Sequence, residues 1–163
     1  MPIPRDRRNN EKTEHFIPVN NNPAGRHTGD CVYRAMAFFF GWSWLTLFWD
    51  LSCHCAETGL VQTWNEGFRS YLDQQGYKMN QGPRRENGKK YTIGEFVEEC
   101  AKPGHRYLVV SSNHMTFILD KVIYDTWNPS RRVVSCYWES AGESIEKKPL
   151  YEEVKMKRAD GGR

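Results

Sequence analysis

The spacing of hydrophobic residues changes once along this chain, close to Gly104. Between residues 31 and 103, apolar side chains recur at helical spacing, with glycine and proline between the segments. Beyond Gly104, the apolar residues form short β-branched and aromatic runs that are separated by turn-forming residues. Helices followed by strands are typical of an α+β protein, and this is the fold class that we predict.

Start and stop signals delimit the predicted helices. We expect the first over residues 31–40, with Asp30 as its N-cap and Gly41 at its end. A second helix begins after Ser43 and ends at Gly59. Two Thr-x-x-Glu capping boxes, at residues 63–66 and 92–95, begin two more. The expected buried faces are Val32, Ala35, Met36 and Phe39 in the first helix, and Leu45, Phe48, Leu51 and Cys55 in the second.

Four runs after Gly104 predict an antiparallel β-meander, in which each strand pairs with the next. The runs cover residues 106–111, 115–119, 122–127 and 133–138. Residues 16–19 add a short strand, and its proline favours the edge of a sheet because proline donates no ladder hydrogen bond.

The chain of 163 residues is long enough for one domain with a substantial core, which we place at residues 15–140. Residues 1–14 are polar and charged, and we expect them to form a flexible arm. Residues 141–163 are rich in charge, and we expect a loosely held tail.

Charge narrows the class of partner. The net charge is only +3, and acidic residues are interspersed with basic ones, which argues against a nucleic-acid partner. A basic run at Arg84, Arg85, Lys89 and Lys90 is interrupted by Glu86. We interpret this run as a solvated loop or as the flank of a substrate cleft.

The expected compartment is the cytoplasm. The first residues carry positive charge, but no apolar stretch follows them, so we expect no secretory signal. No run of about 18 apolar residues is present, so we expect no membrane span. Five cysteines form an odd count without the spacing of a disulfide framework, which favours reduced thiols.

Cys31 is the first candidate for chemistry, because it is the first residue of a predicted helix. Unpaired N–H groups and the positive end of the helix dipole stabilise a thiolate at such a position. Cysteines at helix N-termini can therefore have a pKa of roughly 3.5–7.5 instead of ~8.5. The alternative interpretation is an inert cysteine on the core face of an amphipathic helix.

A nucleophilic thiol needs a base, and the base needs a group that orients it. Among the five histidines, His114 alone opens a predicted strand directly after a turn. If Asp120 and Lys121 form a two-residue turn, Thr116 stands opposite Asp125, and the side chains of His114, Thr116 and Asp125 share one face of the sheet. Asn128 is the alternative orienter, but this register turns it to the other face.

Three segments resemble one family. Residues 29–35 (GDCVYRA) followed by 41–44 (GWSW) look like the nucleophile helix of small papain-like cysteine peptidases from phage and prophage proteins. Residues 113–120 and 124–128 resemble the histidine and aspartate strands of the same proteins. The order Cys, His, Asp along the chain is also that of the papain-like superfamily.

The resemblance implies a papain-like fold, in which the nucleophile helix packs on the C-terminal β-meander. It assigns Cys31 as nucleophile, His114 as general base and Asp125 as the orienter. The implied activity is hydrolysis of peptide or isopeptide and other amide bonds through a thioester, without a cofactor or metal. The implied partner is a protein or peptide substrate, in the host-cell cytoplasm if a phage encodes the chain. The oligomeric state is left open.

One feature of papain is missing from this sequence. Papain has a glutamine before its cysteine that donates to the oxyanion, and no glutamine precedes Cys31. The backbone N–H of Cys31 is one candidate donor, and Asn22 or Thr28 is a candidate for the second.

Other functions also fit parts of the sequence. Cys53, His54 and Cys55, together with Cys100 and His105, are ligand types for a metal, but a Cys-x-Cys pair in mid-helix directs its thiols apart. A papain-like scaffold without activity could serve as a protein-binding module. An acyltransferase would use the same three residues as the hydrolase.

Overall fold

The computed structural model describes residues 11–62, 65–141 and 151. Within these residues the protein is a mixed α+β structure with four helices and one mixed sheet of six strands. The helices are α1 (Cys31–Phe40), α2 (Trp44–Thr58), α3 (Asn65–Gln74) and α4 (Ile93–Glu99). The strands are β1 (Phe16–Pro18), β2 (Asn80–Gln81), β3 (Arg106–Ser111), β4 (His114–Leu119), β5 (Val122–Asp125) and β6 (Cys136–Ser140).

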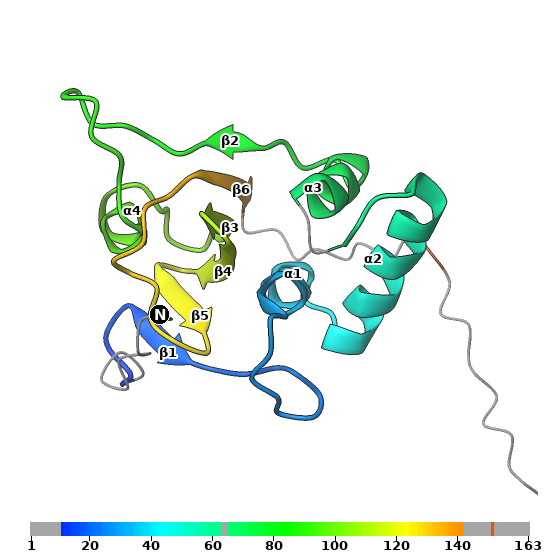
Figure 1. Ribbon diagram of the computed structural model, residues 1–163. Helices are drawn as coiled ribbons and strands as arrows, with labels where there is room; N and C mark the ends of the chain where they lie inside the picture. Colours follow the sequence, from blue (N-terminus) through cyan, green and yellow to red (C-terminus); the bar gives the residue numbers. More distant parts are fainter. Residues whose placement is uncertain (1–10, 63–64, 142–150, 152–163) are drawn as a thin grey trace, which may run out of the picture.

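The sheet separates two hydrophobic cores. Its strand order is β1-β5-β4-β3-β6-β2, with α1, α2 and α3 on one side and α4 on the other (Figure 1). Alternate residues of β3 enter the two cores: Leu108 and Val110 pack in the core on the α1 side, and Tyr107 and Val109 pack in the core with α4. The central strands are therefore covered on both faces.

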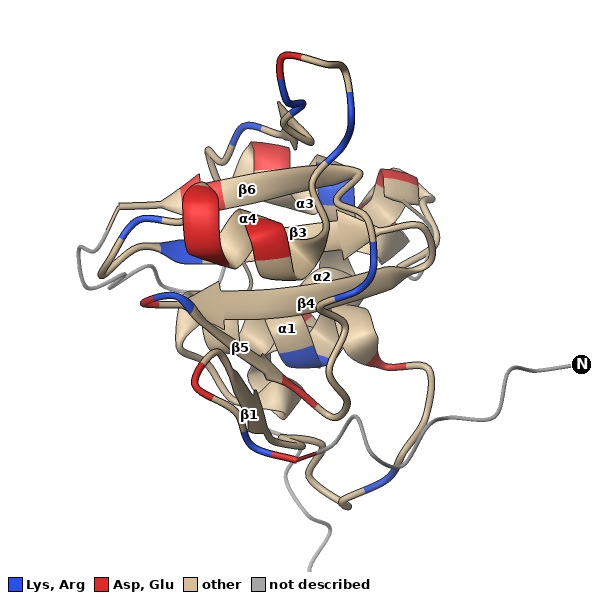
Figure 2. Cartoon of the chain, turned by 90° about the vertical axis from the view of Figure 1, so that its left-hand side faces the viewer, with Lys and Arg blue, Asp and Glu red and all other residues tan. Residues whose placement is uncertain are grey.

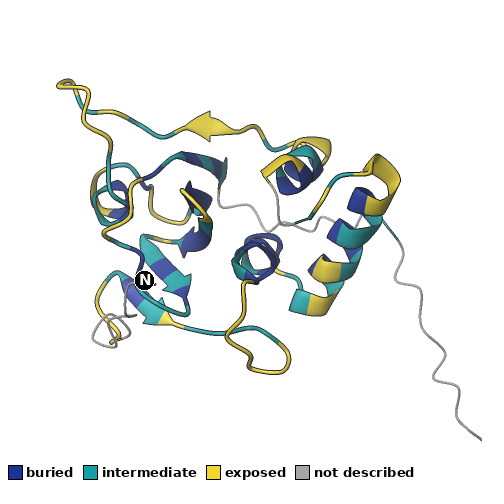
Figure 3. Ribbon diagram, viewed as in Figure 1, coloured by how far each residue is buried: buried dark blue, intermediate teal, exposed yellow. Residues whose placement is uncertain are grey.

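Helix α1 is the most enclosed helix of the described chain (Figure 3). The predicted bounds and buried face are confirmed, and Gly41 ends the helix in the left-handed conformation at φ 68°. Asp30 does stand at the N-cap position, but its side chain makes no capping hydrogen bond. Both carboxylate oxygens of Asp30 instead accept hydrogen bonds from other side chains near the site.

Helix α2 has the predicted ends, but only part of its predicted face is buried. Ser43 accepts a hydrogen bond from the Thr46 backbone N–H, and Gly59 is the C-cap. The expected buried residues Leu45 and Phe48 are exposed by 62% and 36%. Leu51 and Cys55 are buried, as expected, and Leu47, Asp50 and His54 are buried with them.

The two expected capping boxes have different outcomes. Thr92 and Glu95 exchange side-chain and backbone hydrogen bonds at the start of α4, as predicted. Thr63 lies outside the described residues, although α3 begins at Asn65, close to the predicted start.

The β4–β5 hairpin has the predicted register. Leu119 pairs with Val122 and Phe117 with Tyr124. Asp120 and Lys121 both have positive φ, at 48° and 61°, as a two-residue type I′ turn requires. β1 is an edge strand, as expected, and it pairs with β5 in parallel.

The expected meander is wrong at its last strand. β6 pairs with β3, on the side away from β4, and not with β5. The chain between β5 and β6 crosses the start of α4, where the Ile93 N–H donates to the Arg132 carbonyl and the Gly94 N–H to the Ser130 carbonyl. These contacts hold the crossing segment, and the sequence does not show them.

The termini lie partly outside the described residues. Of the expected arm, residues 1–10 are not described, and residues 11–14 are exposed. Of the expected tail, residues 141 and 151 are described. Tyr151 is held on α2, since its N–H donates to Asp50 at 2.8 Å and its hydroxyl to Glu57 at 2.7 Å.

Charges of both signs lie side by side on the surface. Figure 2 shows acidic residues on α4 and basic residues in the neighbouring loop between β2 and α4. In this loop Arg85 forms an ion pair with Glu99 at 2.8 Å and lies over the Tyr91 ring. The basic run is thus partly neutralised by α4. No helix within the described residues is both long and apolar enough to cross a membrane.

Candidate active site

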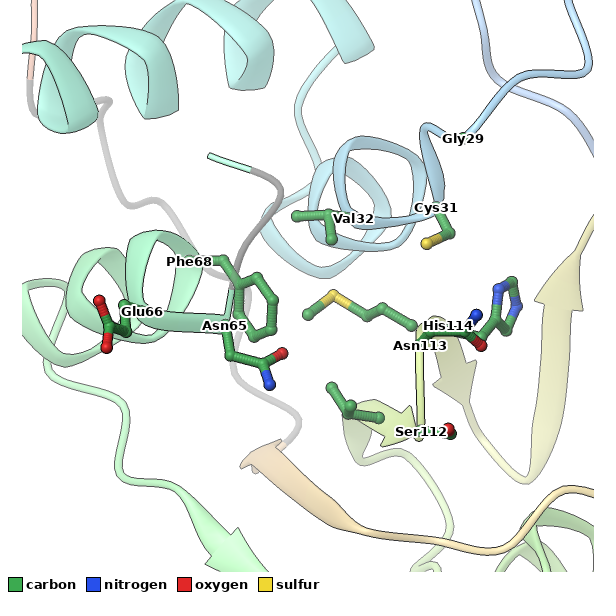
Figure 4. A pocket seen from close by; sticks show the side chains of 11 residues that line it. Gly29, Cys31, Val32, Asn65, Glu66, Phe68, Ser112, Asn113 and His114 are labelled. Atoms are coloured by element: carbon green, nitrogen blue, oxygen red, sulfur yellow. The ribbon is translucent and has the colours of Figure 1, made fainter. Parts of the chain in front are cut away.

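Cys31 lies at the start of α1, on the wall of a cleft (Figure 4). The cleft has a volume of about 530 Å³. Cys31 and His114 lie on one side of it, and Asn65 and Phe68 of α3 lie on the other. The thiol is only half-buried, so a substrate in the cleft can reach it.

His114 is the first residue of β4 and is oriented by Asp125. Its Nε2 lies 2.6 Å from Asp125 Oδ2, at the end of β5. The ring of Trp127 packs against the imidazole, with 4.6 Å between the ring centroids. The contact between His114 and Asp125 is the one that the register of the β4–β5 hairpin predicts.

The other ring nitrogen is left for Cys31. His114 and the Met115 backbone both lie close enough to the Cys31 sulfur to lower the pKa of the thiol. Because Nε2 is bound to Asp125, Nδ1 is the nitrogen that can exchange a proton with the thiol. The three side chains therefore form a connected row across α1, β4 and β5.

The electrostatics favour a thiolate–imidazolium pair. Burial raises the pKa of Cys31, but the hydrogen bond with His114 and the charges of His114 and Arg34 outweigh it and bring the pKa below 9.0. Burial lowers the pKa of His114, but the hydrogen bonds to Asp125 and Cys31 reverse this effect and raise it to about 9. Burial raises the pKa of Asp125, while the bond to His114 and the charge of Arg34 hold it below its usual value. Each partner stabilises the charged form of the next.

Asp125 is also bound through its second oxygen. Oδ1 accepts hydrogen bonds from Arg34 Nη1 at 3.1 Å and from the Thr126 N–H at 2.7 Å. Arg34 in turn donates from Nε to Asp30 Oδ1 at 2.8 Å. Asp30, Arg34 and Asp125 are all buried.

The floor of the cleft is apolar and its rim is polar. Buried lining residues are Val32, Phe68, Val110 and Met115. Exposed lining residues are Gly29, Asn65, Glu66, Ser112 and Asn113.

The expected second oxyanion donors are not at the cleft. The amide nitrogen of Asn22 donates to Asp30 Oδ2 at 2.9 Å, and Thr28 is exposed. Neither residue lines the cleft, whereas Cys31 does. The Cys31 N–H belongs to the first turn of α1, whose N–H groups have no partner within the helix.

Asn128 does not reach His114 as an orienter. Its Oδ1 accepts a hydrogen bond from the Ser130 N–H at 3.1 Å, which closes a turn after β5. The neighbour of His114 Nε2 is Asp125.

The residues considered for a metal lie apart. His54 Nε2 bonds to Ser70 Oγ at 3.0 Å, and His105 Nδ1 bonds to Glu139 at 2.7 Å. Within the described residues, no three histidine, cysteine, aspartate or glutamate side chains form a group that could hold a metal ion. All five cysteines are described and are free thiols.

Sequence reasoning missed Arg34 and the carboxylate role of Asp30. A signal was available, because Arg34 is a charged residue in a helix whose other positions are almost all apolar, and Asp30 is four residues before it. A buried arginine requires carboxylate partners, and the spacing names the first of them. The second partner, Asp125, is distant in sequence.

Comparison of this chain with protein families, with curated proteins and with solved structures finds no match. What the site can do therefore follows from the geometry of its own residues.

Proposed function

We propose that this protein is a cysteine hydrolase that cleaves peptide bonds, or isopeptide and other amide bonds, in protein or peptide substrates. The observation that carries the proposal is the row Cys31–His114–Asp125 at the edge of an open cleft. A thiol, an imidazole and a carboxylate in this order are the parts of nucleophilic acyl transfer. The sequence resemblance to papain-like peptidases agrees with these roles.

In the first half of the reaction, the Cys31 thiolate attacks the substrate carbonyl carbon. The resulting oxyanion accepts a hydrogen bond from the Cys31 N–H at the positive end of α1. The His114 imidazolium then donates its Nδ1 proton to the leaving amine, and the C–N bond breaks. The product is a thioester between Cys31 and the acyl group.

In the second half, His114 is neutral and acts as a general base. It takes a proton from water, the hydroxide attacks the thioester, and the sulfur leaves as a thiolate. Asp125 holds the ring through Nε2 in both halves, so that Nδ1 always faces the sulfur. We place this chemistry in a reducing compartment, the cytoplasm, which keeps the thiol reduced.

The first test is the selectivity of thiol labelling. The protein is treated with iodoacetamide at pH 6, and the modified cysteines are mapped by mass spectrometry. We expect Cys31 to react first, because its pKa is lowered, whereas burial raises the pKa of Cys53 and of Cys100, which are also half-buried. Equal or slower labelling of Cys31 than of Cys53 contradicts the proposal.

The second test separates hydrolysis from the alternatives. A peptide library is incubated with the protein and with the Cys31→Ala variant, and products are read by mass spectrometry. Hydrolysis that is lost in the variant supports the proposal. A labelled Cys31 with products formed only when an amine acceptor is added indicates an acyltransferase. No labelling and no products indicate an inactive binding scaffold.

A further inference from the structure

The charged groups behind the candidate triad form a second row of contacts. Asp30, Arg34 and Asp125 are only 4%, 7% and 3% exposed. Moving a guanidinium and two carboxylates out of water is costly unless each finds close partners. Here each does, since Arg34 bonds to Asp30 at 2.8 Å and to Asp125 at 3.1 Å. A buried arginine that bonds to two carboxylates, in a helix that is otherwise almost entirely apolar, points to a role for that arginine.

The guanidinium divides its donors between the two carboxylates. Nε donates to Asp30 Oδ1, while Nη1 donates to Asp125 Oδ1 and to the Thr126 hydroxyl. The planar guanidinium presents these donors in fixed directions, which the single ammonium of lysine does not do. The remaining Asp125 oxygen, Oδ2, faces His114. Both oxygens of the orienting carboxylate are therefore fixed.

Asp30, the other end of this contact, is itself anchored. Its Oδ2 accepts from the Trp44 indole N–H at 3.0 Å and from the Asn22 amide at 2.9 Å. These donors come from α2 and from the loop before α1. The arginine is thereby fixed to the first turn of the helix that carries Cys31, and through Asp125 to β5.

From this geometry we infer that Arg34, anchored by Asp30, is a positioning residue. It connects the helix of Cys31 to the carboxylate of Asp125 and so keeps the imidazole of His114 aligned with the sulfur. For its consequence in catalysis, this inference rests on the proposed hydrolase function. Arg34 does not line the cleft, so it acts through Asp125 and not on the substrate.

Two variants distinguish the effect of the position of the Arg34 guanidinium from the effect of its charge. Arg34→Lys keeps the positive charge but cannot occupy both the Nε and the Nη1 sites. The double variant Asp30→Asn with Arg34→Met removes one charge of each sign, so the net charge around His114 stays the same. If Arg34 acts only through its charge, the pKa of His114 is unchanged in Arg34→Lys and does not fall in the double variant, because the lost guanidinium contacts Asp125 and the lost carboxylate does not. If it positions Asp125, the bond to His114 weakens and the pKa of His114 falls in both.

The experiment is an NMR titration of His114 in histidine-labelled protein, together with iodoacetamide labelling of Cys31 at pH 6. We expect the pKa of His114 to fall by about one unit in Arg34→Lys and by at least as much in the double variant. Labelling of Cys31 should slow about tenfold, as the weaker imidazolium stabilises less thiolate. If the protein is a hydrolase, kcat falls and KM stays the same.

The matched control is Arg106→Lys. Arg106 also contacts α1, through a hydrogen bond to the Phe39 carbonyl at 3.3 Å, but at the other end of the helix. This variant should keep the His114 pKa and the labelling rate of the parent. A His114 pKa that falls in neither Arg34 variant overturns the inference, as does an equal fall in the control. Should Arg34→Lys fail to fold, the charge-balanced double variant decides.

Failure of the proposed function has a different signature. If Cys31 of the parent protein is not labelled and the protein cleaves no peptide, the hydrolase proposal is wrong. The NMR titration still reports whether Arg34 holds the Asp125–His114 pair in that case.

Discussion

Asp125 and Asn128 both follow β4 and are the two alternative partners of His114. Asp125 Oδ2 lies 2.6 Å from the imidazole, whereas the Asn128 amide oxygen closes a turn with Ser130. We predict that Asp125→Ala slows Cys31 alkylation at mildly acidic pH, because the imidazolium loses its carboxylate. Loss of an orienting carboxylate can lower kcat by as much as ~10⁴. Asn128→Ala should change kcat far less.

The measurement is the pH profile of iodoacetamide labelling for both variants and the parent. The mid-point should move to higher pH in Asp125→Ala and stay in place in Asn128→Ala. A displaced profile in Asn128→Ala beside a parent-like Asp125→Ala would show that the asparagine orients the ring.

The sequence was sufficient for the His114–Asp125 pair and insufficient for Arg34. The pair lies in one hairpin, and a two-residue turn fixes its register, so counting along the chain places both side chains on one face. Arg34 reaches Asp125 across an interface between α1 and β5. No local rule connects two residues that are so far apart in sequence. Likewise, the sequence predicts Asn22 as an oxyanion donor but does not show that its amide donates to Asp30.

Local sequence signals predict where the helices begin and end better than they predict which face of a helix is buried. Ser43, Gly59 and Thr92 act on their own backbone neighbours, so their roles can be recognised without the fold. The buried face of α2 depends on what packs there. Asp50 turns inward to bind the Tyr71 hydroxyl at 2.5 Å, and Phe48 remains on the surface, stacked on Trp44. A pattern of apolar residues alone could not predict a buried carboxylate.

The position of β6 was also beyond local signals. The run at residues 133–138 predicts a strand, whereas β6 covers Cys136–Ser140. Hydrogen bonds from the start of α4 hold the preceding segment where it crosses to the far side of β3. A meander was the simplest order for consecutive strands, and the actual order depends on contacts between elements.

Gly67 lets helix α3 approach the segment that precedes it, at Val61. A Cβ at Gly67 would lie 2.2 Å from the Val61 carbonyl oxygen, so Gly67→Ala must displace α3 or this segment. We expect a loss of about 1–3 kcal/mol in the free energy of unfolding. Labelling of Cys31 should persist, since α3 forms the opposite wall of the cleft.

Gly94→Ala in α4 is the matched control. Its Cβ would meet the Ser130 Cβ at 3.2 Å and the Ser130 carbonyl oxygen at 3.3 Å, contacts that a small shift of the Ser130 segment relieves. Urea unfolding should show Gly94→Ala within about 1 kcal/mol of the parent, because alanine also favours a helix. Equal stability of both variants would mean that α3 does not approach Val61 so closely.

The stability of the protein depends on pH through the site, because the pKa values of His114 and Cys31 differ between the folded and the unfolded chain. His114 has a pKa of about 9 when folded against 6.5 in an unfolded chain, so its contribution to stability is complete below pH 6.5 and is lost as pH rises towards 9. Cys31 has a folded pKa below 9.0, so its contribution is complete above pH 9.0 and is lost as pH falls through the folded value. Between pH 6.5 and 9 the two slopes oppose each other.

The Cys31→Ser variant removes the slope of Cys31, whereas Asp125 still raises the pKa of His114, so the opposing slope of His114 is reduced but not lost. The free energy of unfolding of the parent relative to this variant should rise with pH up to 9.0, by at most about 1.4 kcal/mol per pH unit. Cys55→Ser is the control, because Cys55 is a buried thiol whose pKa burial raises. Relative to that variant, the parent should show no rise, and it should lose stability only above pH 9.0.

Urea unfolding of the three proteins between pH 6 and 10 measures both differences. The sign of the slope is decisive, because it does not depend on how much either substitution destabilises the fold at a single pH. A rising difference for Cys31 means that the folded protein holds its thiolate against the imidazolium of His114. A flat or falling difference, like that expected for Cys55, would make Cys31 an ordinary core thiol and would remove the basis of the proposed chemistry.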